Sequence, residues 1–156
     1  MLKNQGNEFL GGEKSRQSQD FLNHTYSIIL FDGICNLCNQ WVNFVIDRDI
    51  KNEFRFASLQ SEVGQQILFK AGLPKDYLDS IVLIEKGKAY LYSASILRTM
   101  KHLNKLWPAM YILIAVPSVL RDWVYKWVAS NRYSWFGKQK TCRVPTPEIE
   151  SRFLTE

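Results

Sequence analysis

The sequence predicts an α/β domain in which helices cover a mixed β-sheet and a helical extension follows. Short apolar runs rich in β-branched and aromatic residues alternate with stretches whose apolar residues recur at helical spacing. The third such run is followed at once by a turn and a fourth run, which is the pattern of a β-hairpin. Residues 26–105 are therefore expected to fold in the order βαβαββα. The first crossover makes a parallel pair, and the hairpin adds an antiparallel edge.

The first strand and helix are predicted over residues 26–47. The apolar run that ends at Phe31 is followed by an Asp-Gly turn signal at Asp32 and then by Cys35 and Cys38. Cys35 is expected where the strand stops and the helix begins, so that unpaired N–H groups and the positive end of the helix dipole face its sulfur. Cys38 lies one turn further on, within disulfide reach but more sheltered by the helix. This pattern predicts Cys35 as the attacking thiol and Cys38 as the resolving thiol.

The second strand and helix follow a charged surface turn. Residues 54–59 alternate in the manner of a strand. Ser61 suits the cap of the next helix, and Gly72 with Pro74 marks its end. The apolar residues of this helix fall on one face, namely Val63, Ile67, Leu68 and Ala71.

The hairpin and the third helix complete the predicted core. Residues 81–84 form a continuous apolar run, which is typical of a strand buried on both faces. A turn over 85–88 leads to a second run over 89–92. Ser93 or Ser95 then caps a helix. Its apolar positions repeat at helical spacing and are Ile96, Leu97, Met100 and Leu103.

Two further helices are predicted beyond the core. Residues 107–116 are expected to be helical between two prolines, and another helix opens at Ser118 and ends near Asn131. The second of these has an aromatic and apolar face made of Leu120, Trp123, Val124, Trp127 and Val128. The apolar stretch over 106–120 falls short of the roughly 20 residues that span a bilayer. We expect this face to pack on the protein's own core, in preference to contact with a membrane.

Composition and charge set the boundaries and the class of protein. Residues 1–25 are polar without an apolar signal segment and are predicted to be a disordered arm, 26–142 form the domain, and 143–156 form an irregular tail containing Pro145 and Pro147. The net charge of +5 is scattered, which does not favour nucleic-acid binding. Three cysteines, two of them in one motif, differ from a secreted disulfide framework and favour a reducing, cytoplasmic location.

A Cys-x-x-Cys at the start of a helix within a βαβ pattern points to redox chemistry, because one thiolate and a second thiol within bonding reach are what thiol exchange needs. The alternative is a structural zinc site in a non-enzymatic module. Zinc needs four nitrogen or sulfur ligands, and the other candidates, Cys142, His24 and His102, lie far apart in the sequence. Neither a metal nor a cofactor is therefore predicted. A second non-enzymatic alternative is a module that docks to a membrane or a partner through residues 107–127.

Two further residues, Asp32 and Cys142, keep two interpretations each. Asp32 is either a proton acceptor for Cys38 or the first residue of an Asp-Gly turn. Cys142 is either a spare surface thiol or a third redox participant. The dipeptide between the cysteines, Asn36-Leu37, carries no positive charge, so extreme thiol acidity is not expected. This favours a reductant or a general exchanger over a disulfide donor.

The residues Phe31-Asp32-Gly33-x-Cys35-x-x-Cys38 resemble the motif of the DCC family of predicted thiol-disulfide oxidoreductases, which is named for an Asp-Cys-Cys motif. Stretches at 57–60, 79–83 and 132–142 are also similar to that family. The resemblance implies a thioredoxin-like fold and a protein-disulfide oxidoreductase with Asp32, Cys35 and Cys38 as its site residues. It implies a protein or small-molecule disulfide as substrate.

The sequence departs from thioredoxin itself at one place. In thioredoxin a cis-proline immediately precedes the third strand of this core and faces the disulfide. Here Asp79-Ser80 stands at that place, and Pro74 is too far upstream to substitute. Backbone docking of a substrate in the thioredoxin manner is therefore not predicted.

Overall fold

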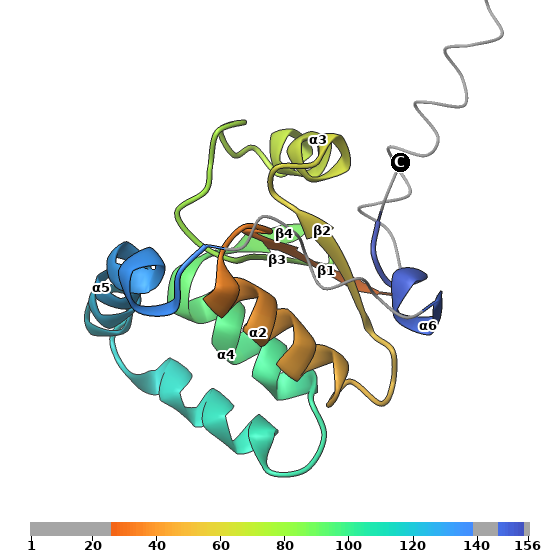
Figure 1. Ribbon diagram of the computed structural model, residues 1–156. Coiled ribbons are helices and arrows are strands. Elements are labelled where there is room, and N and C mark those ends of the chain that lie inside the picture. Colours follow the sequence, from red (N-terminus) through yellow and green to blue (C-terminus); the bar gives the residue numbers. More distant parts are fainter. Residues whose placement is uncertain (1–25, 139–146, 155–156) are drawn as a thin grey trace, which may run out of the picture.

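The computed structural model describes residues 26–138 and 147–154. The predicted arm over 1–25 lies outside these residues. The described elements follow the predicted βαβαββα order and continue into C-terminal helices (Figure 1). They are β1 (Ser27–Phe31), α2 (Asn36–Ile46), β2 (Phe54–Ser58), α3 (Glu62–Lys70), β3 (Val82–Glu85), β4 (Lys88–Tyr90), α4 (Tyr92–His102), the 3₁₀ helix η1 (Trp107–Ala115), α5 (Ser118–Phe136) and α6 (Pro147–Glu150).

The four strands form one mixed sheet in the order β2-β1-β3-β4. β1 runs parallel to β2 and antiparallel to β3, and β3 and β4 form the antiparallel hairpin at the edge. Helix α3 covers one face of the sheet, and α2 and α4 cover the other (Figure 1). The prediction of a mixed sheet with a parallel crossover pair and an antiparallel hairpin is confirmed.

Strand β1 is the centre of the core because it is buried on both faces. Ile29 and Phe31 belong to the apolar cluster that includes α2 residues, whereas Ile28 and Leu30 belong to the cluster that includes α3 residues. This alternation follows from the two-residue period of a strand. Each fully buried side chain of this size stabilises the fold by about 1.5–3 kcal/mol relative to an exposed one. The end of β1 is therefore a rigid support for the residues that follow it.

The helix starts agree with the sequence in one case and differ in another. Ser61 caps α3, because its side chain accepts a hydrogen bond from the Gly64 N–H at 3.0 Å. Helix α4 instead begins after Leu91, and neither predicted serine caps it. The Ser93 hydroxyl donates to Asp122 of α5, and the Ser95 hydroxyl donates to the Tyr92 carbonyl at 2.7 Å. Ser93 therefore contacts α5 and Ser95 bonds within α4, and neither hydroxyl is used as a cap.

Helix α5 is longer than predicted. The sequence placed its end near Asn131, but the helix continues to Phe136 and ends at Gly137, whose φ is 76°. The Asn131 side chain donates to the Trp127 carbonyl at 2.8 Å, one turn back within the helix. A polar residue satisfied in this way does not have to end a helix.

The prediction that the aromatic face of this extension packs on the core is wrong. Leu120, Trp123 and Trp127 do share a face, but they are 56%, 65% and 54% exposed. Helix η1 likewise contains no buried residue. The opposite face of α5, which carries Tyr125 and the buried Arg132, is the one that points inward. None of the described helices is long and apolar enough to cross a membrane.

The tail was predicted to be irregular, but its described part contains a short helix and pairs with the sheet. After the short helix α6, Phe153 pairs with Phe56 of β2 in a parallel bridge, and its ring lies 6.2 Å from the Phe31 ring. Arg152 forms a buried ion pair with Asp49. The tail therefore extends the sheet edge beyond β2, which two prolines in the sequence did not suggest.

Candidate active site

The two cysteines of the motif lie at the junction between β1 and α2, as predicted. Cys35 is the N-cap of α2, and Cys38 lies in its first turn. Both are free thiols. The Asn39 side chain donates to the Gly33 carbonyl at 3.0 Å and ties the preceding turn to the helix. The N–H groups at a helix start lack partners within the helix, so they favour negative charge at this position.

The relative burial of the two thiols differs from the prediction. Cys38 was expected to be the more sheltered, but Cys35 is 0% exposed and Cys38 is 6% exposed. The reason is a contact from residues 136–138, which we call the cover segment. Lys138 pairs with Cys35 in an antiparallel bridge, and the Asn36 side chain donates to the Phe136 carbonyl at 2.7 Å. The end of α5 therefore lies across the start of α2.

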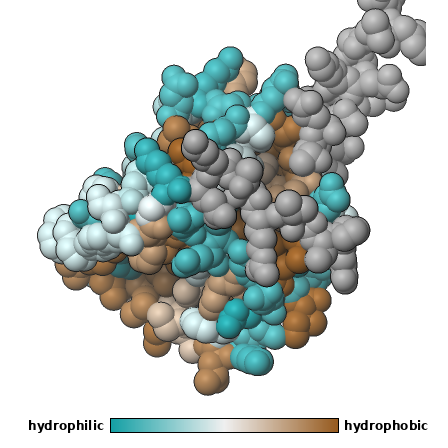
Figure 2. All heavy atoms as spheres, in the orientation of Figure 1, coloured by the Kyte–Doolittle hydropathy of each residue, from teal (hydrophilic) through white to brown (hydrophobic). Residues whose placement is uncertain are grey.

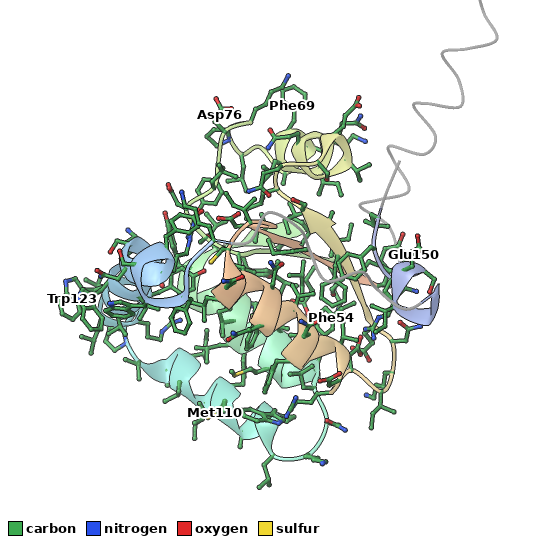
Figure 3. The ribbon with its side chains drawn as sticks, viewed as in Figure 1. Phe54, Phe69, Asp76, Met110, Trp123 and Glu150 are labelled. Atoms are coloured by element: carbon green, nitrogen blue, oxygen red, sulfur yellow. The ribbon has the colours of Figure 1, made fainter. Side chains whose placement is uncertain are left out.

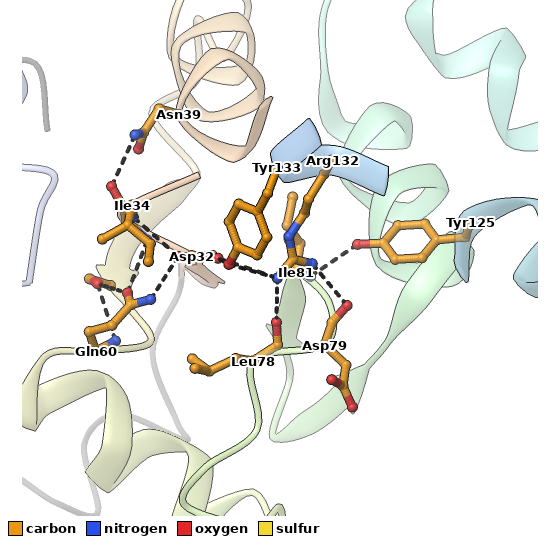
Figure 4. A network of polar contacts seen from close by, with 12 residues as sticks. Asp32, Ile34, Asn39, Gln60, Leu78, Asp79, Ile81, Tyr125, Arg132 and Tyr133 are labelled. Atoms are coloured by element: carbon orange, nitrogen blue, oxygen red, sulfur yellow. Dashed lines mark hydrogen bonds and ion pairs between the residues drawn. The ribbon is translucent and has the colours of Figure 1, made fainter. Parts of the chain in front are cut away.

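Asp32 is the centre of a buried polar network (Figure 4). It is 2% exposed, and its Oδ1 accepts hydrogen bonds from the Ile34 N–H at 3.1 Å and from the Gln60 side chain at 2.7 Å. Its Oδ2 accepts from Arg132 at 3.3 Å and from the Tyr133 hydroxyl. The bond to Ile34 confirms the turn interpretation. The role of Asp32 as a proton acceptor for Cys38 stays a prediction.

Arg132 is the residue of this network that the sequence did not single out. Besides its ion pair with Asp32, its guanidinium donates to the carbonyls of Leu78 at 2.8 Å and Asp79 at 3.2 Å (Figure 4). These carbonyls belong to the loop before β3, where thioredoxin carries its cis-proline. One hundred residues separate Asp32 from Arg132, and the only sequence signal was the family-like stretch at 132–142.

The surroundings of Cys38 favour its neutral thiol form. Burial raises the pKa of Cys38 to about 12, and the neighbouring Cys35, which also hydrogen-bonds to it, adds to this rise. Arg132 opposes the rise with its positive charge, whereas Asp32 contributes to it. Cys38 is a neutral thiol at neutral pH, which suits a resolving thiol more than an attacking one.

This shift predicts how the stability of the reduced protein depends on pH. The pKa of Cys38 rises from 9.0 to about 12 on folding, so between these values the unfolded chain releases a proton that the folded chain keeps. The contribution of the Cys38 thiol to the free energy of unfolding is complete below about pH 9 and is lost as the pH rises toward 12. We expect Cys38→Ala to lose less free energy of unfolding between pH 9 and 11 than the reduced parent, measured by urea denaturation. Parallel pH profiles would contradict the assigned shift.

A small cavity of about 160 Å³ lies beside Cys38. Its lining is mainly apolar and consists of Leu37, Cys38, Trp41, Ile81, Ile96, Tyr125, Val128, Ala129 and Arg132. Two buried donors of this lining, Trp41 Nε1 and Arg132 Nε, have no acceptor within the described part of the chain. The cavity therefore gives access to the Cys38 side of the dithiol and offers hydrogen-bond donors there.

Of the other candidate residues, the structure describes only His102, which lies outside this network. His102 hydrogen-bonds to Glu53 at 2.9 Å and to Glu85 at 2.7 Å, which is a structural link between strands and α4. Cys142 and His24 lie outside the described residues. Across 26–138 and 147–154, no three histidine, cysteine or acidic side chains come together in a group that could hold a metal ion.

A dithiol at a strand-to-helix junction of a mixed α/β sheet defines the class of thiol–disulfide exchange proteins. The chain belongs to the DCC1-like thiol-disulfide oxidoreductase family, whose model matches residues 29–138. This membership supports a thiol–disulfide redox role, and the mixed sheet with its helices is consistent with the thioredoxin-like fold that the motif implied.

Two relatives extend this comparison. The uncharacterized protein YuxK of Bacillus subtilis is 48% identical over 127 residues, which cover 81% of this chain and 93% of the relative. The chloroplastic DCC family protein At1g52590 of Arabidopsis thaliana is 38% identical over 138 residues, which cover 83% of this chain and 80% of the relative. No solved structure matches significantly.

Proposed function

We propose that this protein reduces or exchanges disulfides through Cys35 and Cys38. The observation that carries the proposal is a pair of free thiols at the start of α2, where the chain leaves β1. Cys35 then attacks a substrate disulfide as a thiolate, forms a mixed disulfide with one half and releases the other half as a thiolate. The helix start favours the charge that this step uses.

In the second step Cys38 loses its proton and attacks the Cys35 sulfur. The Cys35–Cys38 disulfide forms, and the second half of the substrate leaves as a thiol, so that two electrons pass from the dithiol to the substrate. Arg132 lowers the pKa of Cys38 through its positive charge, so we assign it the role of stabilising the Cys38 thiolate in this step. Asp32 positions Arg132 through their buried ion pair. A second dithiol returns the protein to its reduced state by the reverse exchange.

The burial of Cys35 adds a requirement to this mechanism. A substrate disulfide must reach a sulfur that the bridge to Lys138 covers. Within the described residues, few polar contacts hold the cover segment to α2, namely this bridge and the bonds of Asn36 to the carbonyls of Phe136 and Gly137. Segments held by few contacts open at low free-energy cost. We therefore assign the cover segment an opening that precedes attack by Cys35.

Trapping of the intermediate tests the two thiol roles. In a Cys142→Ser background, which removes the third thiol, Cys38→Ser is expected to accumulate a mixed disulfide with a partner, because no thiol remains to resolve it. Cys35→Ser is expected not to do so. Non-reducing electrophoresis after trapping in cells and intact mass after reaction with a small disulfide measure the adduct. Equal trapping by both variants would count against the roles, and trapping by neither would count against the redox function.

A further inference from the structure

Helix α5 is amphipathic, with its apolar side facing outward. Val119, Leu120, Trp123, Val124 and Trp127 follow one helical stripe, and their exposed fractions run from 47% to 82%. The inward side instead carries polar anchors. Tyr125 accepts a hydrogen bond from the Ile81 N–H at 3.1 Å, and Arg132 holds the network of Asp32. The polar network therefore fixes the orientation of α5 and leaves its apolar stripe outside.

Helix η1 continues the same surface. Leu106, Ile112 and Leu113 are 86%, 77% and 42% exposed, and Met110 is 39% exposed. We call this surface the apolar face, and it consists of Leu106, Met110, Ile112, Leu113, Val119, Leu120, Trp123, Val124 and Trp127. A groove of about 410 Å³ between α4, η1 and α5 adds an almost entirely apolar lining to it. Hydrophobic side chains gather along the lower edge of the molecule beneath α5 (Figure 2).

The net charge of the chain lies in the segment that carries this face. Residues 101–138 contain six basic side chains and one acidic one, whereas the rest of the chain contains fourteen of each, so this segment accounts for the entire net charge of +5. The one acidic residue, Asp122, accepts a hydrogen bond from Ser93, which in turn accepts one from Arg121 at 2.8 Å. Lys105 and Lys126 are exposed beside the face. Arg132 is buried on the inward side of α5, so Lys105 and Lys126 supply the exposed positive charge beside the face, and 101–138 contains no carboxylate without a partner.

We propose that the apolar face docks on the surface of an anionic membrane, with α5 and η1 lying in the plane of the interface. Exposed tryptophans next to apolar residues and lysines are the composition that interfacial segments share. Lysine and arginine near a membrane surface add electrostatic attraction to anionic lipids. A second copy of the chain is a poorer occupant, because it would bring two surfaces of the same positive charge together. The helices rest on the membrane, since none of those described can cross it.

Vesicle binding by the full chain tests this proposal. We expect the protein at physiological salt to co-sediment with vesicles of phosphatidylcholine and phosphatidylglycerol at least about tenfold more tightly than with phosphatidylcholine alone. Trp123→Ser/Trp127→Ser should weaken this binding by at least about tenfold, because both side chains are more than half exposed and supply the aromatic anchors of the face. Phe69→Ser is the matched control and should bind as the parent does. Phe69 is 67% exposed but lies on α3, far from Trp123 and Met110 (Figure 3).

Three results would overturn the proposal. The first is no vesicle binding, and the second is equal weakening by Phe69→Ser. The third is a dimer that forms without vesicles and is lost in Trp123→Ser/Trp127→Ser, which would assign the face to a second copy. The test is independent of the proposed redox function, because Cys35→Ser should retain vesicle binding while it loses disulfide exchange.

Discussion

Replacing Arg132 by methionine is expected to lower the free energy of unfolding by about 3–5 kcal/mol, because it leaves a buried carboxylate without its counter-charge. Asp32 is 2% exposed and Arg132 is 7% exposed, so water does not replace the lost partner. The carbonyls of Leu78 and Asp79 also lose their donor. Urea denaturation of the reduced protein measures the change.

The double variant Asp32→Asn/Arg132→Met shows whether the charge is the cause. It removes the stranded carboxylate and should recover a large part of the loss. Arg98→Met is the matched control, because Arg98 pairs with Glu85 at 2.9 Å but is 28% exposed, and Glu85 keeps its bond to His102. We expect that control to cost about 1 kcal/mol or less. A loss for Arg132→Met no larger than that of Arg98→Met would show that the network does not hold α5.

Replacing Gly137 by alanine is expected to raise the rate at which Cys35 is alkylated, on the order of tenfold. Gly137 has φ 76° and ψ 179°, a region that is open to glycine and strained for other residues by about 1–3 kcal/mol. The strain falls on the residue between α5 and Lys138, so it destabilises the pairing that covers Cys35. A larger open population should then react faster.

Iodoacetamide labelling of the reduced protein, followed by peptide mass spectrometry, measures this rate in a Cys142→Ser background. Gly72→Ala is the matched control. Gly72 has the same φ of 76° and also follows a helix, α3, but its contacts do not involve the dithiol. If Gly72→Ala raised the alkylation rate of Cys35 as much as Gly137→Ala does, the faster labelling would come from global unfolding. The cover segment would then not limit the access of the reagent to Cys35. An unchanged rate in Gly137→Ala would mean that Cys35 is reached by another route.

The local sequence pattern was sufficient to predict the order of the strands and helices in the core. The β-branched run ending at Phe31, the Ser61 cap and the turn before β4 each depend on residues a few positions apart, so propensity and periodicity predict them. The same holds for the placement of Cys35 at the start of α2. The strand-to-helix junction is encoded within a dozen residues, and the structure confirms it.

The site beyond the two cysteines depended on contacts that sequence periodicity does not encode. The helical period shows that Trp123 and Trp127 share a face, but it does not show which face of α5 points inward. Here the buried pair of Asp32 and Arg132 decided it, through an interaction across one hundred residues. The burial of Cys35 likewise comes from Lys138, which the chain brings back only after α5. The dithiol and its helix thus follow from local sequence, whereas packing of the whole fold sets the charges around the dithiol and the segment that covers it, because burial and ion pairing are properties of the assembled fold.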